Sequence, residues 1–90
     1  MERRTVFFLG NVQGVGFRYT TCQIASDHRV SGFVRNLADG RVELVAEGEG
    51  AEVERFVAAV EQQMQRQIAS VESQQTPIPQ QEHTGFRIAR

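Results

Sequence analysis

The residues best placed for chemistry lie between Gln13 and Arg18, where two glycines precede an arginine. Glycine-rich backbone lets successive N–H groups point toward one place, and the start of a helix leaves further N–H groups without partners. The arginine adds a planar guanidinium that donates two parallel hydrogen bonds to one phosphoryl group. These features predict a phosphate-binding loop, although a glycine-rich turn beside an arginine is more often only structural.

Other phosphate-binding motifs do not fit this stretch. A dinucleotide-binding fingerprint needs a third glycine where Tyr19 stands, and a Walker A loop needs a lysine, whereas all ten basic residues are arginine. A cysteine-dependent phosphatase places an arginine six residues after its nucleophile, but His28 stands six residues after Cys22. Cys22 falls on an apolar helical stripe and is interpreted as packing, and neither His28 nor His83 is placed for catalysis.

The motif from Val12 to Arg18 is followed 18 residues later by Asn36, and this pattern resembles the acylphosphatase family. The likeness continues from Gly32 to Asn36 and from Asp39 to Glu43, and it returns at Gly85 to Ile88. The resemblance implies a ferredoxin-like fold. It also implies an enzyme that hydrolyses the carboxyl-phosphate bond of small acyl phosphates to carboxylate and inorganic phosphate, with no cofactor and no metal.

The same resemblance assigns roles within the site. Arg18 and Asn36 are the expected catalytic residues, with Arg18 holding the phosphoryl group and Asn36 positioning the attacking water. The expected substrate-binding residues form the cradle: Gln13, Gly14, Val15, Gly16, Phe17 and Arg18. The structural alternatives are a surface ion pair between Arg18 and Asp39, and an asparagine that merely supports the hairpin after its strand.

A cradle and a residue that holds water are sufficient because the substrate is itself reactive. An acyl phosphate is a mixed anhydride, so its carboxylate leaving group departs without being protonated. If phosphoryl transfer passes through a loose transition state, positioning and charge stabilisation supply most of the rate. The lack of a Ser-His-Asp set or of paired carboxylates at catalytic spacing is therefore consistent with an enzyme.

The elements that must position the loop follow from hydrophobic spacing. Strands are expected at 6–9, 30–36, 42–45 and 85–88, with a weaker candidate at 68–75, and helices at 17–28 and 51–65. Asp39-Gly40 predicts a hairpin between the second and third strands. The order predicts an α+β, ferredoxin-like two-layer sandwich, βαββαβ, with two helices on one face of an antiparallel sheet.

Three details bear on the surroundings of these elements. The acidic run Glu47, Glu49, Glu52 and Glu54 is interpreted as a solvated face that favours the start of the second helix. His83 stands alone in a polar connection. His28 and Arg29 replace the leucine and glycine with which the family usually ends the first helix, so that end should pack differently.

The composition predicts one folded domain over residues 1–90, with 40% hydrophobic and 23% charged residues. A net charge of -1 argues against a broad nucleic-acid surface, and the apolar run Val6 to Leu9 is too short for a membrane span or signal peptide. The single cysteine cannot form an internal disulfide. We expect a cytoplasmic monomer whose partner is a small acyl phosphate, with no nucleic acid and no membrane.

Two other function classes compete with the enzyme. A non-catalytic module that binds small anions or carbamoyl phosphate would use the same cradle without turnover. An RNA-binding ferredoxin-like domain would need aromatic residues interleaved with basic ones on the sheet face, and the sequence does not provide them. Release of phosphate from a simple acyl phosphate separates the first alternative from the enzyme.

Catalysis should not depend on a metal ion, because no His, Cys and carboxylate cluster has the spacing of a ligand set. The purified protein should hydrolyse an aromatic acyl phosphate at the same rate with and without a strong chelator, and inorganic phosphate should compete with the substrate. Activity that is abolished by chelator and restored by magnesium would contradict this expectation.

Overall fold

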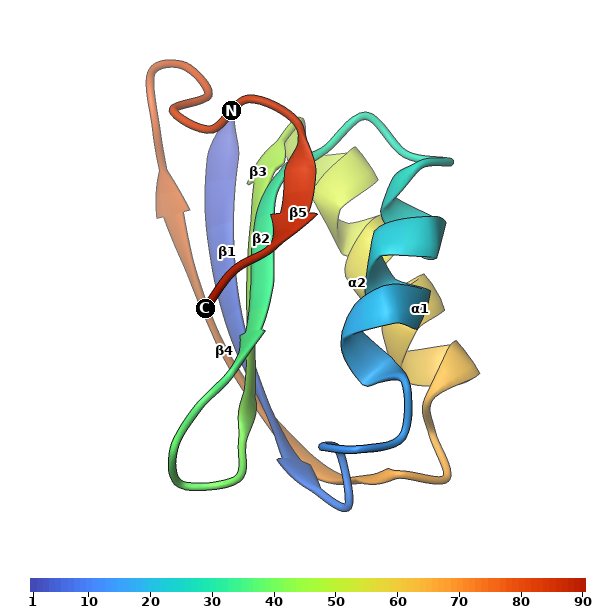
Figure 1. The fold of residues 1–90 in the computed structure, drawn as a ribbon. Helices are drawn as coiled ribbons and strands as arrows, with labels where there is room; N and C mark the ends of the chain where they lie inside the picture. The colour runs from blue at the N-terminus through green and yellow to red at the C-terminus, as the bar shows by residue number, and fades with distance from the viewer.

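The computed structural model describes all 90 residues as two layers, a five-stranded sheet with two helices packed on one of its faces (Figure 1). The elements are β1 (Glu2–Gly10), α1 (Phe17–Ala25), β2 (Ser31–Asn36), β3 (Val42–Gly48), α2 (Gly50–Gln63), β4 (Ile68–Pro77) and β5 (Phe86–Ile88). The strands lie in the order β4-β1-β3-β2-β5. The predicted βαββαβ order is confirmed, with β5 added at one edge.

The sheet is mixed, whereas the sequence pattern predicts an antiparallel one. The first four strands pair antiparallel, but β5 pairs parallel with β2, with Gly32 opposite Phe86 and Val34 opposite Ile88. The cause is the path of the preceding connection, residues 78–85, which runs along one end of the sheet and enters β5 beside the start of β2 (Figure 1). Since β4 runs opposite to β2, a chain that turns back at that end of the sheet runs parallel to β2 when it pairs with it.

The core lies between the sheet and the helices. The predicted apolar stripe of α2 is confirmed, because it is buried along its whole length: Val53, Phe56, Val57, Val60 and Met64. At the start of α1, the Phe17 ring packs on Phe8 of β1 with ring centres 4.9 Å apart. This contact anchors the loop that carries the phosphate-binding motif.

Helix α1 ends at Ala25, earlier than the expected end near His28. The N–H groups of Asp27 and His28 bond three residues back, to Ile24 and Ala25, so the last turn tightens and the helix cannot continue. The His28 ring packs against the Phe56 ring at 5.7 Å. No residue other than glycine has positive φ, so this helix end needs no left-handed cap.

No helix of the chain is long and apolar enough to cross a membrane.

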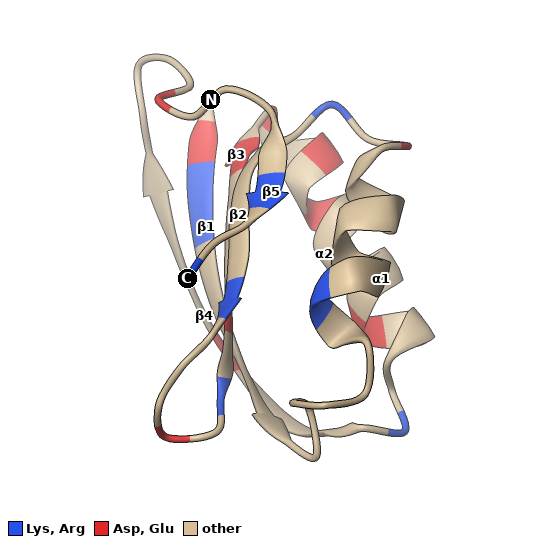
Figure 2. Cartoon of the chain, in the orientation of Figure 1, with Lys and Arg blue, Asp and Glu red and all other residues tan.

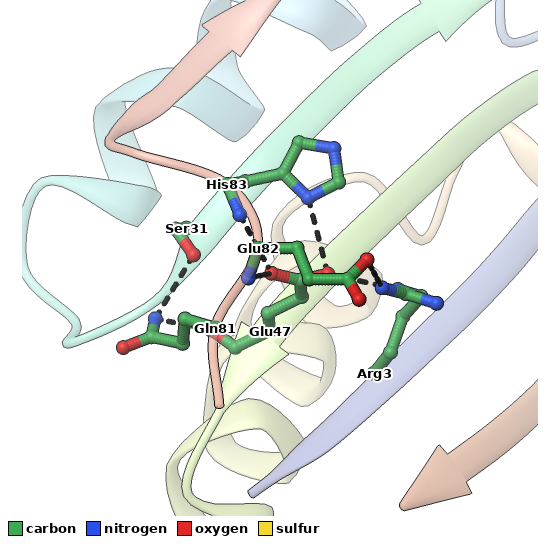
Figure 3. A network of polar contacts seen from close by, with 6 residues as sticks. All are labelled: Arg3, Ser31, Glu47, Gln81, Glu82 and His83. Carbon is green, nitrogen blue, oxygen red and sulfur yellow. Dashed lines mark hydrogen bonds and ion pairs between the residues drawn. The ribbon is translucent and has the colours of Figure 1, made fainter. Parts of the chain in front are cut away.

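Glu47 does not belong to a solvated face, contrary to the interpretation of the acidic run. Its side chain points to the face of β3 away from the helices and is fully buried, because the 78–85 connection covers it (Figure 3). The N–H groups of Glu82 and His83 donate to Oε1 at 2.7 and 2.9 Å, and Arg3 Nε donates to Oε2 at 2.8 Å. His83 is therefore not alone, since its Nδ1 lies 3.1 Å from Oε2.

Three further contacts complete this network. The Gln81 side chain donates to Ser31 Oγ at 2.9 Å and to the Glu47 carbonyl at 3.1 Å, and Arg3 also pairs with Glu82. We call the whole group the Glu47 clasp, with the members Arg3, Ser31, Glu47, Gln81, Glu82 and His83 (Figure 3). The clasp joins β1, β2 and β3 to the connection that leads to β5.

The hydrogen bonds of the Glu47 clasp favour the ionised carboxylate. Burial by itself would raise the pKa of Glu47, but the donors from His83, Arg3 and Glu82 outweigh it and lower the pKa to about 2. A carboxyl group whose pKa in the folded protein lies below its ordinary value of 4.5 stabilises the fold at pH values above 4.5. This stabilisation is lost as the pH falls from 4.5 toward 2.

Glu47→Gln should therefore unfold more easily than the wild type at pH 7, by on the order of 3 kcal/mol, and the difference should shrink as the pH falls below 5. Urea unfolding at pH 7, 5, 4 and 3 measures both curves. The same difference at every pH would show that the charge of Glu47 does not stabilise the fold.

Candidate active site

The loop between β1 and α1 turns through two glycines in the left-handed region. Gly14 has φ 76° and Gly16 has φ 79°, a conformation that side chains disfavour. No atom lies within 4 Å of the place where a Cβ would stand at either glycine, so the backbone conformation, not crowding, requires glycine. Gly16 caps α1 without any side-chain hydrogen bond.

This conformation leaves a row of backbone donors free. The first helical hydrogen bond is donated by the Thr20 N–H to the Gly16 carbonyl at 3.0 Å. The N–H groups from Gly14 to Tyr19 donate to no other backbone group. They are the partnerless donors of a helix start, which attract an anion.

Arg18 stands in the first turn of α1, is exposed and makes no ion pair. The alternative ion pair with Asp39 is not formed, because Asp39 Oδ2 accepts instead from Arg41 Nε at 2.8 Å. Figure 2 shows that the β1–α1 loop carries no charged residue and that most acidic residues lie toward the other end of the molecule. The guanidinium is thus free for an anionic ligand.

Asn36 is the last residue of β2, and its side-chain oxygen Oδ1 is buried without a hydrogen-bond partner. A buried acceptor without a partner costs free energy, so such groups are rare unless a ligand or water serves them. The hairpin is supported by another residue: Gln13 Nε2 donates to the carbonyls of Leu37 at 2.8 Å and Arg41 at 3.0 Å. The structural alternative for Asn36 therefore finds no support in its contacts.

These features surround one pocket of about 130 Å³. Its lining residues are Val12, Gly14, Gly16, Phe17, Arg18, Tyr19, Asn36 and Ile88. The structure thus brings five of the expected site residues together: Gly14, Gly16, Phe17, Arg18 and Asn36. Gln13 and Val15 do not line it, and the side chain of Gln13 is engaged with the hairpin.

Sequence reasoning missed three lining residues, Val12, Tyr19 and Ile88. Tyr19 directly follows Arg18 at the start of the predicted helix, and this position was the available signal that it lies near the candidate site. Ile88 had no local signal, because it reaches the pocket only through the parallel pairing of β5 with β2.

Cys22 lies away from the pocket and packs, half-buried, against the hydrophobic core. Burial raises the pKa of its thiol, which keeps it protonated and a poor nucleophile. This confirms its interpretation as a packing residue. No three His, Cys, Asp or Glu side chains gather in an arrangement that could hold a metal ion.

The fold and the pocket together define a small α+β domain with a pocket at the start of its first helix. The sequence model of the family described as acylphosphatase matches residues 4–88, so the chain belongs to the acylphosphatase family. The chain is accordingly an enzyme that hydrolyses acyl phosphates, which are small-molecule substrates.

Individual relatives agree with this assignment. The acylphosphatase of Methanospirillum hungatei is 38% identical over 88 residues, which is 98% of this chain and 93% of the relative. The crystal structure of the acylphosphatase from Bacillus subtilis superposes with a TM-score of 0.88 at 30% identity, covering 100% of both chains. HypF of T. kodakarensis matches with a TM-score of 0.81 at 31% identity, covering 99% of this chain but 12% of HypF.

Proposed function

We propose that Arg18 and the backbone donors of the β1–α1 loop bind the phosphoryl group of the acyl phosphate, and that Asn36 positions the attacking water. The observation that carries this proposal is that Asn36, whose buried Oδ1 has no hydrogen-bond partner, lines the same pocket as Arg18 and the two loop glycines. Two parts of the chain that are far apart in sequence, the β1–α1 loop with Arg18 and the end of β2, thus offer an anion site and a water acceptor at one place.

In this mechanism the chain positions the reactants and stabilises charge. The Arg18 guanidinium donates to two phosphoryl oxygens, and the loop N–H groups donate to the remaining one, which neutralises the near-dianionic group. Asn36 Oδ1 accepts a hydrogen bond from water and aims a water lone pair at phosphorus. The new P–O bond forms as the anhydride P–O bond breaks. The electron pair of the broken bond leaves with the carboxylate, and the proton of the water passes to the phosphate product.

We also propose that residues 1–90 act as one domain and as a cytoplasmic monomer, without nucleic acid or membrane partners. The net charge of -1 and the confinement of the anion site to one loop support this proposal. The non-catalytic alternative, a module for small anions or carbamoyl phosphate, is disfavoured by the full-length match to the Bacillus subtilis acylphosphatase.

Replacing Arg18 tests the phosphate cradle. Arg18→Ala should weaken competitive inhibition by phosphate and lower kcat/KM by about 10²-fold or more, and Arg18→Lys should recover little because a lysine lacks the planar fork. Arg66→Ala is the matched control, since Arg66 is exposed on the α2–β4 turn outside the pocket. Near-normal activity of Arg18→Lys would show that two-pronged recognition is not needed.

Replacing Asn36 tests the water position. Asn36→Ala should lower kcat by at least about 10²-fold, on the order of 2.7 kcal/mol, because the interaction is made mainly in the transition state. The phosphate inhibition constant should change little. The Tm should stay equal or rise, since a buried oxygen without a partner is removed. A lower Tm with an unchanged kcat would instead identify a structural asparagine.

A further inference from the structure

Strand β5 supplies one wall of the pocket although it is the shortest strand. It has three residues, lies at the edge of the sheet and pairs only with β2. Ile88 stands opposite Val34, which is two residues before Asn36, so Ile88 and Asn36 share one face of the sheet. Both line the pocket. The position of β5 therefore determines where the wall of the pocket lies beside Asn36.

β5 pairs with β2 and packs against α1, and further hydrogen bonds flank its short ladder. The Gly32 N–H donates to the Gly85 carbonyl and the Ala89 N–H to the Val34 carbonyl, each at 2.9 Å. The Phe86 ring meets Phe56 edge-on, with ring centres 5.4 Å apart. Ile88 at the far end of β5 is 45% exposed. The chain that enters β5 adds a further restriction on where the strand lies.

The Glu47 clasp grips this entering chain two residues before Gly85. The buried Glu47 carboxylate accepts from the N–H groups of both Glu82 and His83, and the His83 ring packs on Phe33 of β2 at 5.6 Å (Figure 3). Each residue spans at most about 3.6 Å, so the grip at His83 restricts where Phe86 can start its pairing. The Glu47 carboxylate thus restricts the position of β5 through the short stretch of chain between His83 and Phe86.

We propose that Glu47 is a positioning residue for substrate recognition: through the 78–85 connection it sets β5 so that Ile88 forms the acyl-side wall of the phosphate pocket. This inference rests on the proposed roles of Arg18 and Asn36 in that pocket.

The wall that the clasp positions is apolar. Four large apolar residues of the chain are exposed, and Tyr19, Ile88 and Val15 are three of them. Tyr19 and Ile88 line the pocket, and Val15 belongs to its loop. Exposed apolar surface gathered around an anion site suits an apolar group attached to the anion. The clasp should therefore matter more for a bulky apolar acyl phosphate than for a small one.

The test compares Glu47→Gln, Ile88→Ala and the double variant, using benzoyl phosphate, acetyl phosphate and inorganic phosphate. Each single variant should raise KM for benzoyl phosphate about fivefold relative to acetyl phosphate, the effect of losing one or two methylene contacts. The inhibition constant of phosphate should stay within about twofold, because the cradle is not part of the clasp. The double variant should be no worse than the poorer single one, since both changes remove the same wall.

Glu52→Gln is the matched control. Glu52 also accepts a backbone N–H from a connection, that of Arg29 at 3.0 Å, but it lies outside both the clasp and the pocket. It should lower stability without changing the KM ratio. Gln81→Ala removes only part of the clasp, and its KM values are measured with the same substrates at a temperature where the variant is fully folded. This variant keeps the test valid if Glu47→Gln does not fold.

Three results of the KM comparison would overturn the inference. These are an unchanged KM ratio in Gln81→Ala, additive effects in the double variant, or the same ratio change in Glu52→Gln. A loss of phosphate affinity in the clasp variants would mean that the clasp acts on the cradle, which also overturns it. None of these results touches the roles of Arg18 and Asn36, because those roles are tested by their own variants.

Discussion

The site depends on one constraint of strand pairing. β1 and β2 each pair antiparallel with β3, which lies between them, so they run in the same direction and their final residues reach the same end of the sheet. The loop after β1 carries the glycines and Arg18, and the last residue of β2 is Asn36. Two segments that are far apart in sequence therefore meet at one pocket. Gln13 strengthens this meeting, because it ties the loop to the hairpin that follows β2.

Arg18 belongs to the half of the ten arginines that have no carboxylate partner. Five others are held by carboxylates: Arg3, Arg4, Arg35, Arg41 and Arg55. Several of these pairs cover the face of the sheet opposite the helices, where the Arg41 guanidinium lies 4.6 Å from the centre of the Phe7 ring. In a chain with a net charge of -1, the proposed anion site combines the unpaired Arg18 guanidinium with a row of free N–H groups.

The two ends of the sheet carry different kinds of polar site. At the pocket, the loop N–H groups and the buried Asn36 oxygen have no hydrogen-bond partners within the protein. At the other end, the Glu47 carboxylate is buried and its oxygens accept hydrogen bonds from three residues. Satisfied buried groups stabilise a fold, whereas partnerless groups cost stability and occur at functional sites. Strand β5 runs from the end that holds the Glu47 carboxylate toward the end that holds the pocket.

Local patterns in the sequence were sufficient for much of this protein. The stripe of α2, the Asp39-Gly40 hairpin and the glycine loop before Arg18 each depend on neighbours within a few residues, so periodicity and turn chemistry predict them. Only the tertiary structure decided the parallel pairing of β5, the burial of Glu47 and the presence of Ile88 in the pocket. These depend on where the 78–85 connection crosses the sheet, and contacts between residues more than 30 positions apart leave no local periodicity to read.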